Sequence, residues 1–296
     1  MKRSLLAFCR DLGLDCVGIA PAKLPNNLLR QLPHSPICPL TPASSWSQRT
    51  AEALLPSAQS IVVALFPYYL GDGPSGNLSR YAYSQDYHLL IDRYLQKITT
   101  WLTEQIPDIK TKICVDTTPL LDRYTAYAAG LGFLGDNHSL INPHYGSYVT
   151  IGSIITNHPF PPDTPLPAEC FHCGRCRTQC PGQCFDATGN FCYETCKSFL
   201  TQKKSDLTGS EIAIIRKTPL IFGCDTCQDV CPHNQNIPIT PLRLFQKDPI
   251  LSLQAAAISH LSNRQFEEKY GDRAFSWRGK KILLRNLSLI SDHIDE

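Results

Sequence analysis

The sequence C-F-H-C-G-R-C-R-T-Q-C-P spans residues 170–181, and G-C-D-T-C-Q-D-V-C-P spans residues 223–232. The first run spaces its four cysteines by two, two and three residues and ends in Pro181, which is the bacterial ferredoxin pattern for an iron–sulfur cluster. The second run has the last three cysteines of that pattern. Together the runs supply seven of the eight thiolates that two 4Fe–4S clusters need. This stretch therefore predicts a ferredoxin-like segment with two clusters.

Cys196 lies in T-C-K-S-F-L-T between the two runs and is the best candidate for the eighth thiolate. In two-cluster ferredoxins the fourth cysteine of each run binds the other cluster. This crossing predicts one set made of Cys170, Cys173, Cys176 and Cys231, and a second set made of Cys180, Cys196, Cys224 and Cys227. Cys184 and Cys192 are the alternatives to Cys196. Zinc sites also use four-cysteine sets, but they do not need a third cysteine in C-x2-C-x2-C followed by C-P.

The composition is that of a protein for the reducing interior of the cell. The chain has 296 residues, of which 43% are hydrophobic, and no apolar run approaches the roughly 20 residues that a membrane span needs. Its N-terminal apolar stretch is too short for a signal peptide, and charged residues follow it too closely. Most of the 14 cysteines cluster at metal-ligand spacing, unlike the disulfides of a small secreted chain. We therefore expect a cytoplasmic protein with no membrane association.

The charge pattern contains one basic run. The net charge is only +2, which does not indicate a general polyanion binder. Between residues 273 and 285 the chain has no acidic residue and carries Arg273, Arg278, Lys280, Lys281 and Arg285. Such a run is more often a solvated face, and the alternative is a contact with phosphates.

Helical and strand patterns alternate along the N-terminal half. We expect helices at residues 3–12 and 86–105, a third after Asp116 with Pro119 in its first turn, and strands at 16–20, 60–66, 111–115 and 147–156. This alternation favours an α/β domain over residues 1–165. The Pro-rich stretch 159–167 then leads into the ferredoxin-like domain at 166–240, and residues 241–296 form a helical C-terminal segment.

Two further motifs are ambiguous on pattern alone. Asp116 ends the strand 111–115, where open α/β sheets place ligand contacts. An N-cap for the helix near Pro119 is the simpler interpretation, because Asp is a preferred cap. The stretch G-L-G-F-L-G at 130–135 has dinucleotide-fingerprint spacing, but it follows a helix where that fingerprint follows a strand. A dinucleotide site is therefore not predicted.

The whole chain resembles the epoxyqueuosine reductase family, which completes queuosine at the wobble position of certain transfer RNAs. The resemblance extends from near the N-terminus to about residue 290. Besides the two cysteine runs, it rests on V-D-T-T-P-L-L-D-R at 115–123, A-G-L-G-F-L-G-D-N at 129–137, N-P-H-Y-G-S-Y-V-T-I-G at 142–152, C-K-S-F-L-T-Q at 196–202 and S-W-R-G-K-K at 276–281.

The resemblance implies a cobalamin-dependent reductase with two 4Fe–4S clusters, whose cobalamin lies in the N-terminal domain. It implies Asp116 as the proton donor, with a pKa that burial beside the cobalamin raises, and it supports Cys196 as the eighth ligand. The implied partners are the tRNA anticodon stem-loop carrying epoxyqueuosine and an external electron donor. The protein itself is expected to be a monomer. The implied cobalamin contacts are Arg49, Ser79, Asp116, Leu140 and Ile151.

Three departures from the family pattern stand out. Asp136 occupies a position where relatives carry Lys, and Tyr127 one where they usually carry Glu. Many relatives also continue into a C-terminal helical repeat domain, whereas this sequence ends at Glu296, which makes the run 273–285 a stronger candidate for a tRNA contact. Two alternatives remain open: a corrinoid and iron–sulfur reductase of a small molecule, similar to a dehalogenase, or a ferredoxin-type electron carrier.

Overall fold

Strand β2 (Ser60–Pro67) is the centre of the N-terminal half, and every one of its residues is buried. The computed structural model describes residues 1–30, 32, 37–41, 49–72, 76–186 and 189–294. In it, β2 lies between β1 (Val17–Pro21) and β6 (Val149–Thr156), and β3 (Thr111–Val115) completes the order β1-β2-β6-β3. All three pairings are antiparallel. The expected α/β description is therefore wrong in strand direction: helices and strands alternate along the chain, but the sheet is that of an α+β fold.

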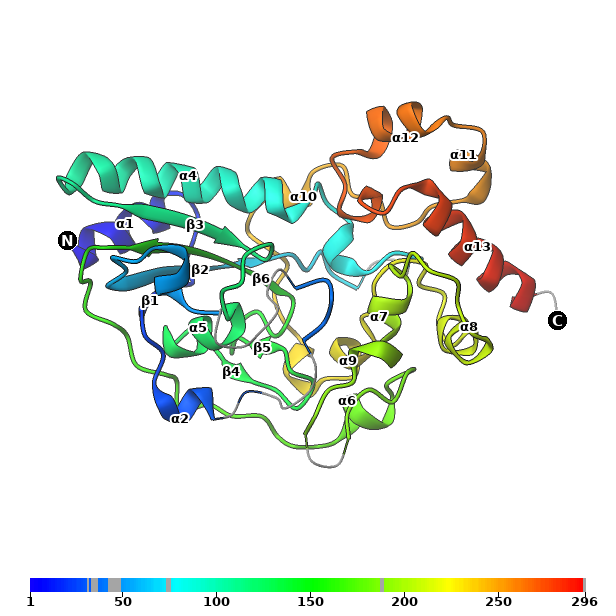
Figure 1. Cartoon of the computed structure of the whole chain (residues 1–296), viewed down its shortest axis with the longest axis horizontal. Helices are drawn as coiled ribbons and strands as arrows, with labels where there is room; N and C mark the ends of the chain where they lie inside the picture. Colours follow the sequence, from blue (N-terminus) through cyan, green and yellow to red (C-terminus); the bar gives the residue numbers. More distant parts are fainter. Residues whose placement is uncertain (31, 33–36, 42–48, 73–75, 187–188, 295–296) are drawn as a thin grey trace.

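Helices cover both faces of this sheet (Figure 1). On one face, α4 (Tyr87–Gln105) packs with α1 (Lys2–Asp11) and buries its apolar side chains at helical spacing. Asp86 caps α4, because its carboxylate accepts the N–H of His88 at 3.0 Å. On the other face lie α5 (Asp122–Ala128), α2 (Asn26–Leu29) and α3 (Ala51–Leu54). The expected strands and the first two expected helices are thus present.

Helix α5 begins later than the sequence suggests. We expected Pro119 in its first turn, whereas the helix starts at Asp122 and its N-cap is Leu121, which makes no side-chain cap. Asp116 therefore does not cap this helix, and the cap interpretation is wrong. Instead Asp116 adopts a left-handed backbone with φ of 48° directly after β3. A non-glycine residue in that region is strained and is frequent at functional sites.

The glycine-rich stretch 130–135 forms a small hairpin. Strand β4 (Phe133–Leu134) pairs with β5 (Leu140–Ile141). A Cβ atom at Gly132 would lie 2.5 Å from the carbonyl oxygen of Ile141, so only glycine allows the two segments to approach so closely. The glycines thus serve the hairpin, in agreement with the absence of a dinucleotide fingerprint.

The cysteine-rich segment is built from short helices. These are α6 (Arg175–Thr178), η3 (Tyr193–Thr195), α7 (Lys197–Leu200), α8 (Gly209–Arg216), α9 (Thr226–Asp229) and η4 (Pro232–Asn234). Helices α6 and α9 contact each other and carry the central cysteines of the two runs, Cys176 and Cys227. The two runs therefore fold in the same way and lie side by side.

The C-terminal helices close the structure around these parts. They are α10 (Arg243–Gln246), α11 (Ala255–Ser259), α12 (Asn263–Tyr270), η5 (Ala274–Ser276) and α13 (Lys280–Ile294). Phe245 of α10 joins the core under α4. The later helices share a separate core with η2 (Arg80–Ala82) and with Ile221 and Phe222. None of the helices in the described part of the chain combines the length and the apolar character that crossing a bilayer requires.

Candidate active site and cluster ligands

The first predicted cysteine set gathers around one pocket. Cys170, Cys173, Cys176 and Cys231 all line one small pocket, together with residues of the β4–β5 hairpin. Burial and then the neighbouring thiolates of Cys170 and Cys173 raise the pKa of Cys231. Cys231 also packs against Phe133 and Ile141 of the hairpin. The structure therefore brings together the set that the crossing pattern predicts.

The second predicted set also comes together. Burial and then the neighbouring thiolates of Cys224, Cys196 and Cys180 raise the pKa of Cys227 far above its usual value. Each of the two sets thus takes at least one cysteine from each run. Thiols without disulfide partners, grouped in two sets of four, are the donors that 4Fe–4S clusters need, so the residues present fit two clusters.

The eighth position is the one with alternatives, and the structure separates them. Cys196 acts electrostatically on both Cys224 and Cys227. Cys184 is buried and contacts the sulfur atoms of Cys180 and Cys196. Its backbone N–H also lies 3.4 Å from Cys180 Sγ. Cys192 is exposed. This arrangement favours Cys196 as the ligand and gives Cys184 a supporting position.

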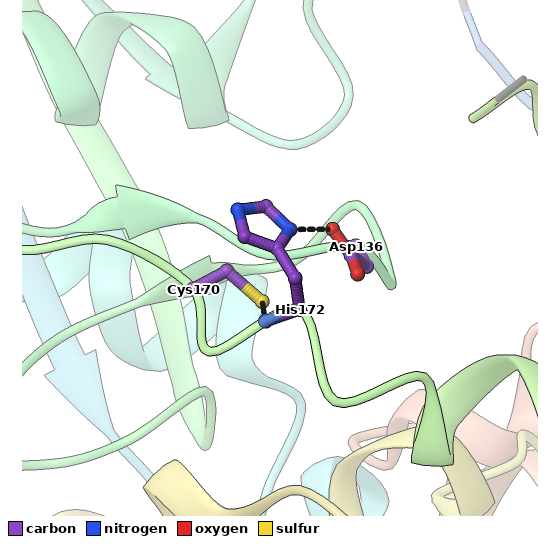
Figure 2. A group of neighbouring side chains, drawn as sticks. All are labelled: Asp136, Cys170 and His172. Atoms are coloured by element: carbon purple, nitrogen blue, oxygen red, sulfur yellow. Dashed lines mark hydrogen bonds and ion pairs between the residues drawn. The ribbon is translucent and has the colours of Figure 1, made fainter.

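Asp136, the acidic departure from the family pattern, pairs with His172 beside the first set. Figure 2 shows His172 Nδ1 at 2.8 Å from Asp136 Oδ1, and the His172 backbone N–H directed at Cys170 Sγ at 3.5 Å. These three side chains lie close enough to hold a metal ion. Cys170 already belongs to the first cluster set, however, so the trio belongs to the surroundings of that cluster.

Asp116 is held by two neighbours at the start of α4. The Tyr87 hydroxyl donates a hydrogen bond to Asp116 Oδ2, and His88 Nε2 lies 3.6 Å from the same oxygen. The Nδ1 atom of His88 contacts Asp86 Oδ1 at 2.7 Å. The Asp116 side chain is 64% exposed to water, yet enough protein surrounds it to desolvate its carboxylate. It is therefore accessible to a reactant while its orientation is fixed.

Asp116 and His88 shift each other's pKa in opposite directions. Desolvation acts to raise the pKa of Asp116, but contacts with His88 and Tyr87 outweigh it and hold the pKa below its usual value. Burial alone would lower the pKa of His88, but its contacts with Asp116 and Asp86 raise that pKa to about 9. The rise expected for the pKa of Asp116 beside bound cobalamin stays a prediction. At neutral pH the proton resides on His88.

Asp122, the first residue of α5, is a second side chain that can bind a proton. Burial and the negative charge of Asp116 raise the pKa of Asp122 to about 7. Its Oδ1 atom is buried and has no hydrogen-bond partner among the described residues. A carboxyl group with this pKa exchanges a proton near neutral pH.

Three of the other residues predicted to contact cobalamin lie on the α5 side of the sheet. Arg49 donates to the carbonyl oxygens of Pro119 and Leu120 at 3.2 and 3.1 Å, just before α5. Leu140 and Ile151 belong to the core that α5 covers. Ser79 lies elsewhere: it is fully buried and donates its hydroxyl to Asp225, between Cys224 and Cys227. Its cobalamin contact stays a prediction, like those of the others.

The same side of the sheet contains polar atoms without protein partners. Besides Asp122 Oδ1, the Thr125 and Ser153 hydroxyls are buried and make no hydrogen bond within the described residues. Thr125 is on α5, and Ser153 is on β6 opposite Cys114. Buried polar atoms normally find a partner. A ligand with many hydrogen-bonding groups therefore fits this region.

Much of the basic run 273–285 is engaged within the protein. Arg273 donates to the carbonyl oxygens of Tyr83 and Asp248, Lys280 to those of Ser259 and Leu261, and Arg285 to those of Leu200, Lys203 and Ser205. Arg278 stacks on the half-exposed ring of Trp277, with 3.6 Å between the guanidinium carbon and the ring centroid. Lys281 is exposed. The run is therefore mainly structural, and Arg278 and Lys281 remain for a phosphate.

Sequence reasoning did not identify Tyr87, His88 or Asp122 as site residues. Tyr87 and His88 begin a helix, and the apolar periodicity of that helix indicated only that they lie on its surface. Asp122 stood inside a matching motif without an assigned role. The order Asp86-Tyr87-His88 contained a signal for His88. Asp86 is a typical N-cap residue, so Tyr87 and His88 are expected in the first turn of the helix. Their proximity to Asp116 depends on the packing of α4 against β3.

Comparisons with known proteins agree with this site. A family model described as epoxyqueuosine reductase QueG, DUF1730, matches residues 49–117, and one described as a 4Fe-4S double cluster binding domain matches residues 169–234. The chain is 36% identical to an epoxyqueuosine reductase of Bacillus cereus over 310 aligned residues, which cover 100% of this chain and 81% of that protein.

Two solved structures are similar over nearly the whole chain. One is an epoxyqueuosine reductase with an epoxyqueuosine-modified tRNA-Tyr stem loop, at a TM-score of 0.85, 32% identity, and coverage of 99% of this chain and 81% of the other. The second, from Bacillus subtilis, has its catalytic aspartate loop swung out of the active site and gives the same four values.

Proposed function

The chain belongs to the epoxyqueuosine reductase family, and we propose how its residues carry out the reduction of epoxyqueuosine in tRNA. It is an oxidoreductase with a 4Fe–4S binding segment. Converting the epoxide into an alkene breaks two carbon–oxygen bonds, consumes two electrons and two protons, and releases the oxygen as water. The protein must therefore deliver electrons one at a time and place proton donors at the leaving oxygen.

The electrons enter through two clusters. We assign Cys170, Cys173, Cys176 and Cys231 to one cluster, and Cys180, Cys196, Cys224 and Cys227 to the other. The grouping of the eight thiols around two separate centres supports this assignment. An external low-potential donor supplies the electrons, because a cluster only passes on the electrons that it receives.

Cobalamin fits the α5 side of the sheet. Arg49, Leu140 and Ile151 lie there, together with buried hydroxyl and carboxyl oxygens that lack partners among the described residues, and Asp116 is close enough to Asp122 of α5 to raise its pKa. When bound, low-valent cobalamin supplies a nucleophile or electron donor for the epoxide carbon. The protein residues position this group and exclude water from it.

Asp116 is the proton donor, and His88 is the source of its proton. The imidazolium of His88 contacts Asp116 Oδ2 on one side and Asp86 on the other, and Tyr87 fixes the Asp116 carboxylate. A proton moving from Nε2 of His88 to Asp116 travels a short distance and then reaches the leaving oxygen. Asp122, with its pKa of about 7, holds the second proton.

One observation carries the proposal. The fold that holds exposed Asp116 in place through Tyr87 and His88 also contains two sets of four thiols. The test uses tRNA bearing epoxyqueuosine, incubated without oxygen with cluster-loaded protein, cobalamin and dithionite. Digestion and mass spectrometry of the nucleosides should show the loss of one oxygen, dependent on cobalamin. An unchanged nucleoside, with both clusters and cobalamin bound, would overturn the proposal.

A further inference from the structure

Lys197 is a buried cation in the cysteine-rich segment. It is 1% exposed and is the first residue of α7, directly after Cys196, which caps that helix. Transferring an ammonium group from water into protein is costly unless a negative charge or strong hydrogen bonds compensate for it. Lysine is therefore rarely buried so completely. Its position next to a cluster ligand calls for a physical account.

The surroundings of the Lys197 amino group suit its ammonium form. Its Nζ atom donates to the carbonyl oxygen of Ile215, the carbonyl oxygen of Thr218 and the hydroxyl of Thr218, each at 2.6 Å. These three acceptors match the three N–H groups of an ammonium.

The positive charge has no carboxylate partner. The ion pairs within the described residues do not include Lys197. The acidic residue of this region, Asp225, accepts hydrogen bonds from Ser79 and from the backbone N–H of Arg80, and the Arg80 guanidinium faces it. Burial lowers the pKa of Lys197 to about 8, and the neighbouring Cys224 acts in the opposite direction.

Cys224 and Cys196 both belong to the second set, so the cation lies beside the place of the second cluster. A 4Fe–4S cluster held by four thiolates is negatively charged, and its reduction adds one electron and no proton. A desolvated cation nearby stabilises the added charge, and net charge is among the factors that set cluster potentials. At the first set, burial and then the acidic residue Asp136 raise the pKa of Cys176, and no lysine in the described part of the chain is buried beside it.

We propose that Lys197 is the buried counter-ion of the second cluster, the one bound by Cys180, Cys196, Cys224 and Cys227, and that its charge raises the reduction potential of this cluster. The inference rests on the cluster assignment proposed above. An electron from the external donor is then held on the second cluster more firmly than it would be beside a neutral residue.

The test is a potentiometric titration with dithionite, in which electron paramagnetic resonance follows each cluster. The variants are Lys197→Met and Lys197→Gln, which remove the charge, and Lys197→Arg, which keeps it. Lys203→Met is the matched control, because Lys203 is already paired with Glu211 at 2.7 Å. In both neutral variants the ratio of reduced to oxidised second cluster at a fixed potential should fall about tenfold, a shift of about 59 mV for a one-electron couple. The first cluster, Lys197→Arg and the control should not shift.

Unshifted potentials in both neutral variants would overturn the proposal, as would an equal shift in Lys197→Arg. If the neutral variants fold but lose the second cluster, full iron content in Lys197→Arg supports the counter-ion role, and loss there too overturns it. The iron content of the unmodified protein separates the two proposals. About eight iron atoms per chain upholds the assignment, whereas about four would remove the second cluster and the inference with it.

Discussion

Asp116 owes its orientation to strain and to two side chains from another element. Its left-handed backbone turns the carboxylate away from β3, and Tyr87 and His88 of α4 hold it there. The cost of such a backbone, on the order of 1–3 kcal/mol, is offset by these contacts. The group therefore consists of a fixed acceptor, Asp116, and a charged donor, His88.

Replacing Asp116 by Asn should leave iron content and cobalamin binding unchanged and lower turnover by about 100-fold or more, because an amide cannot carry a proton to the leaving oxygen. Turnover is measured by mass spectrometry of the nucleosides under single-turnover conditions. Asp11→Asn, on the exposed face of α1, is the matched control and should keep full activity. Full activity of Asp116→Asn would exclude the donor role.

The pH dependence of turnover should follow His88. Its pKa is raised from 6.5 to about 9, so the imidazolium persists through neutral pH and is lost as the pH rises through about 9. The contribution of its ion pairs to stability is likewise complete below about 6.5 and disappears above 9. Turnover measured from pH 6 to 10 should fall near 9, and His88→Asn should be slow throughout without this alkaline fall. An unaltered profile in that variant would show that the proton comes from elsewhere.

At the scale of elements, one turn joins the sheet half to the second cysteine set. Gly223 precedes Cys224, has φ of 73°, and donates its N–H to Thr201 Oγ1 at 3.0 Å. The Leu78–Phe222 bridge lies beside it. A Cβ atom at Gly223 would lie 2.4 Å from the Cβ atom of Ser79. The chain can pass here only because this residue has no side chain.

Gly223→Ala should therefore lower the free energy of unfolding by about 2–5 kcal/mol, from left-handed strain and overpacking together, and should reduce the iron bound by the second set. Thermal unfolding and iron content measure the two effects. Gly209→Ala is the control: no atom lies within 4 Å of its added Cβ, and alanine favours the α8 helix there. Equal stability of the two variants would contradict the close approach at Gly223.

The predicted ligand crossing makes the two runs interdependent at the scale of the whole molecule. Cys173→Ala and Cys231→Ala should each remove the first cluster, and their combination should lose no more iron than either alone. Cys173→Ala combined with Cys227→Ala should lose both clusters, because its two positions belong to different sets. Iron analysis of anaerobically purified variants distinguishes these outcomes. If the Cys173/Cys231 pair lost all iron, the crossing would be refuted.

The cysteine segment is fixed to the sheet half by polar contacts. Tyr148 donates to Asp229 at 2.6 Å, and the Ser147 N–H donates to Asn234 Oδ1 at 2.7 Å. The Ser79–Asp225 bond adds a third link. The C-terminal helices use most of the basic run to hold neighbouring carbonyl oxygens, so we expect Arg278 and Lys281 to make its contacts with phosphates.

Alanine at both Arg278 and Lys281 should therefore weaken binding of the tRNA stem-loop and flatten the dependence of log Kd on log salt by about 1–2. Alanine at Arg273 or Arg285 should instead lower Tm, since these side chains pair with backbone carbonyl oxygens. Filter binding at several salt concentrations and thermal unfolding separate the two effects. An unchanged salt slope in the double variant would place the phosphate contacts outside this run.

Several features could be predicted from the amino-acid order because they depend on neighbours in the chain. The cysteine spacings indicate cluster ligands, since a thiolate set needs short loops of defined length. The apolar run of β2 and the helical stripe of α4 follow from local periodicity. Family motifs indicated that Asp116 is the proton donor, whereas the sequence pattern alone favoured a helix cap.

Other features depend on residues distant in sequence and became known from the folded chain. Strand direction was missed because alternating helices and strands do not specify how strands pair. The contacts that lower the pKa of Asp116 could not be foreseen, because Tyr87 and His88 reach it from another helix. Much of the basic run is likewise engaged by carbonyl oxygens that are distant in the sequence. Lys197 looks like an ordinary surface lysine in the sequence. Burial and charge compensation are properties of packing, and packing brings together atoms that the linear chain keeps apart.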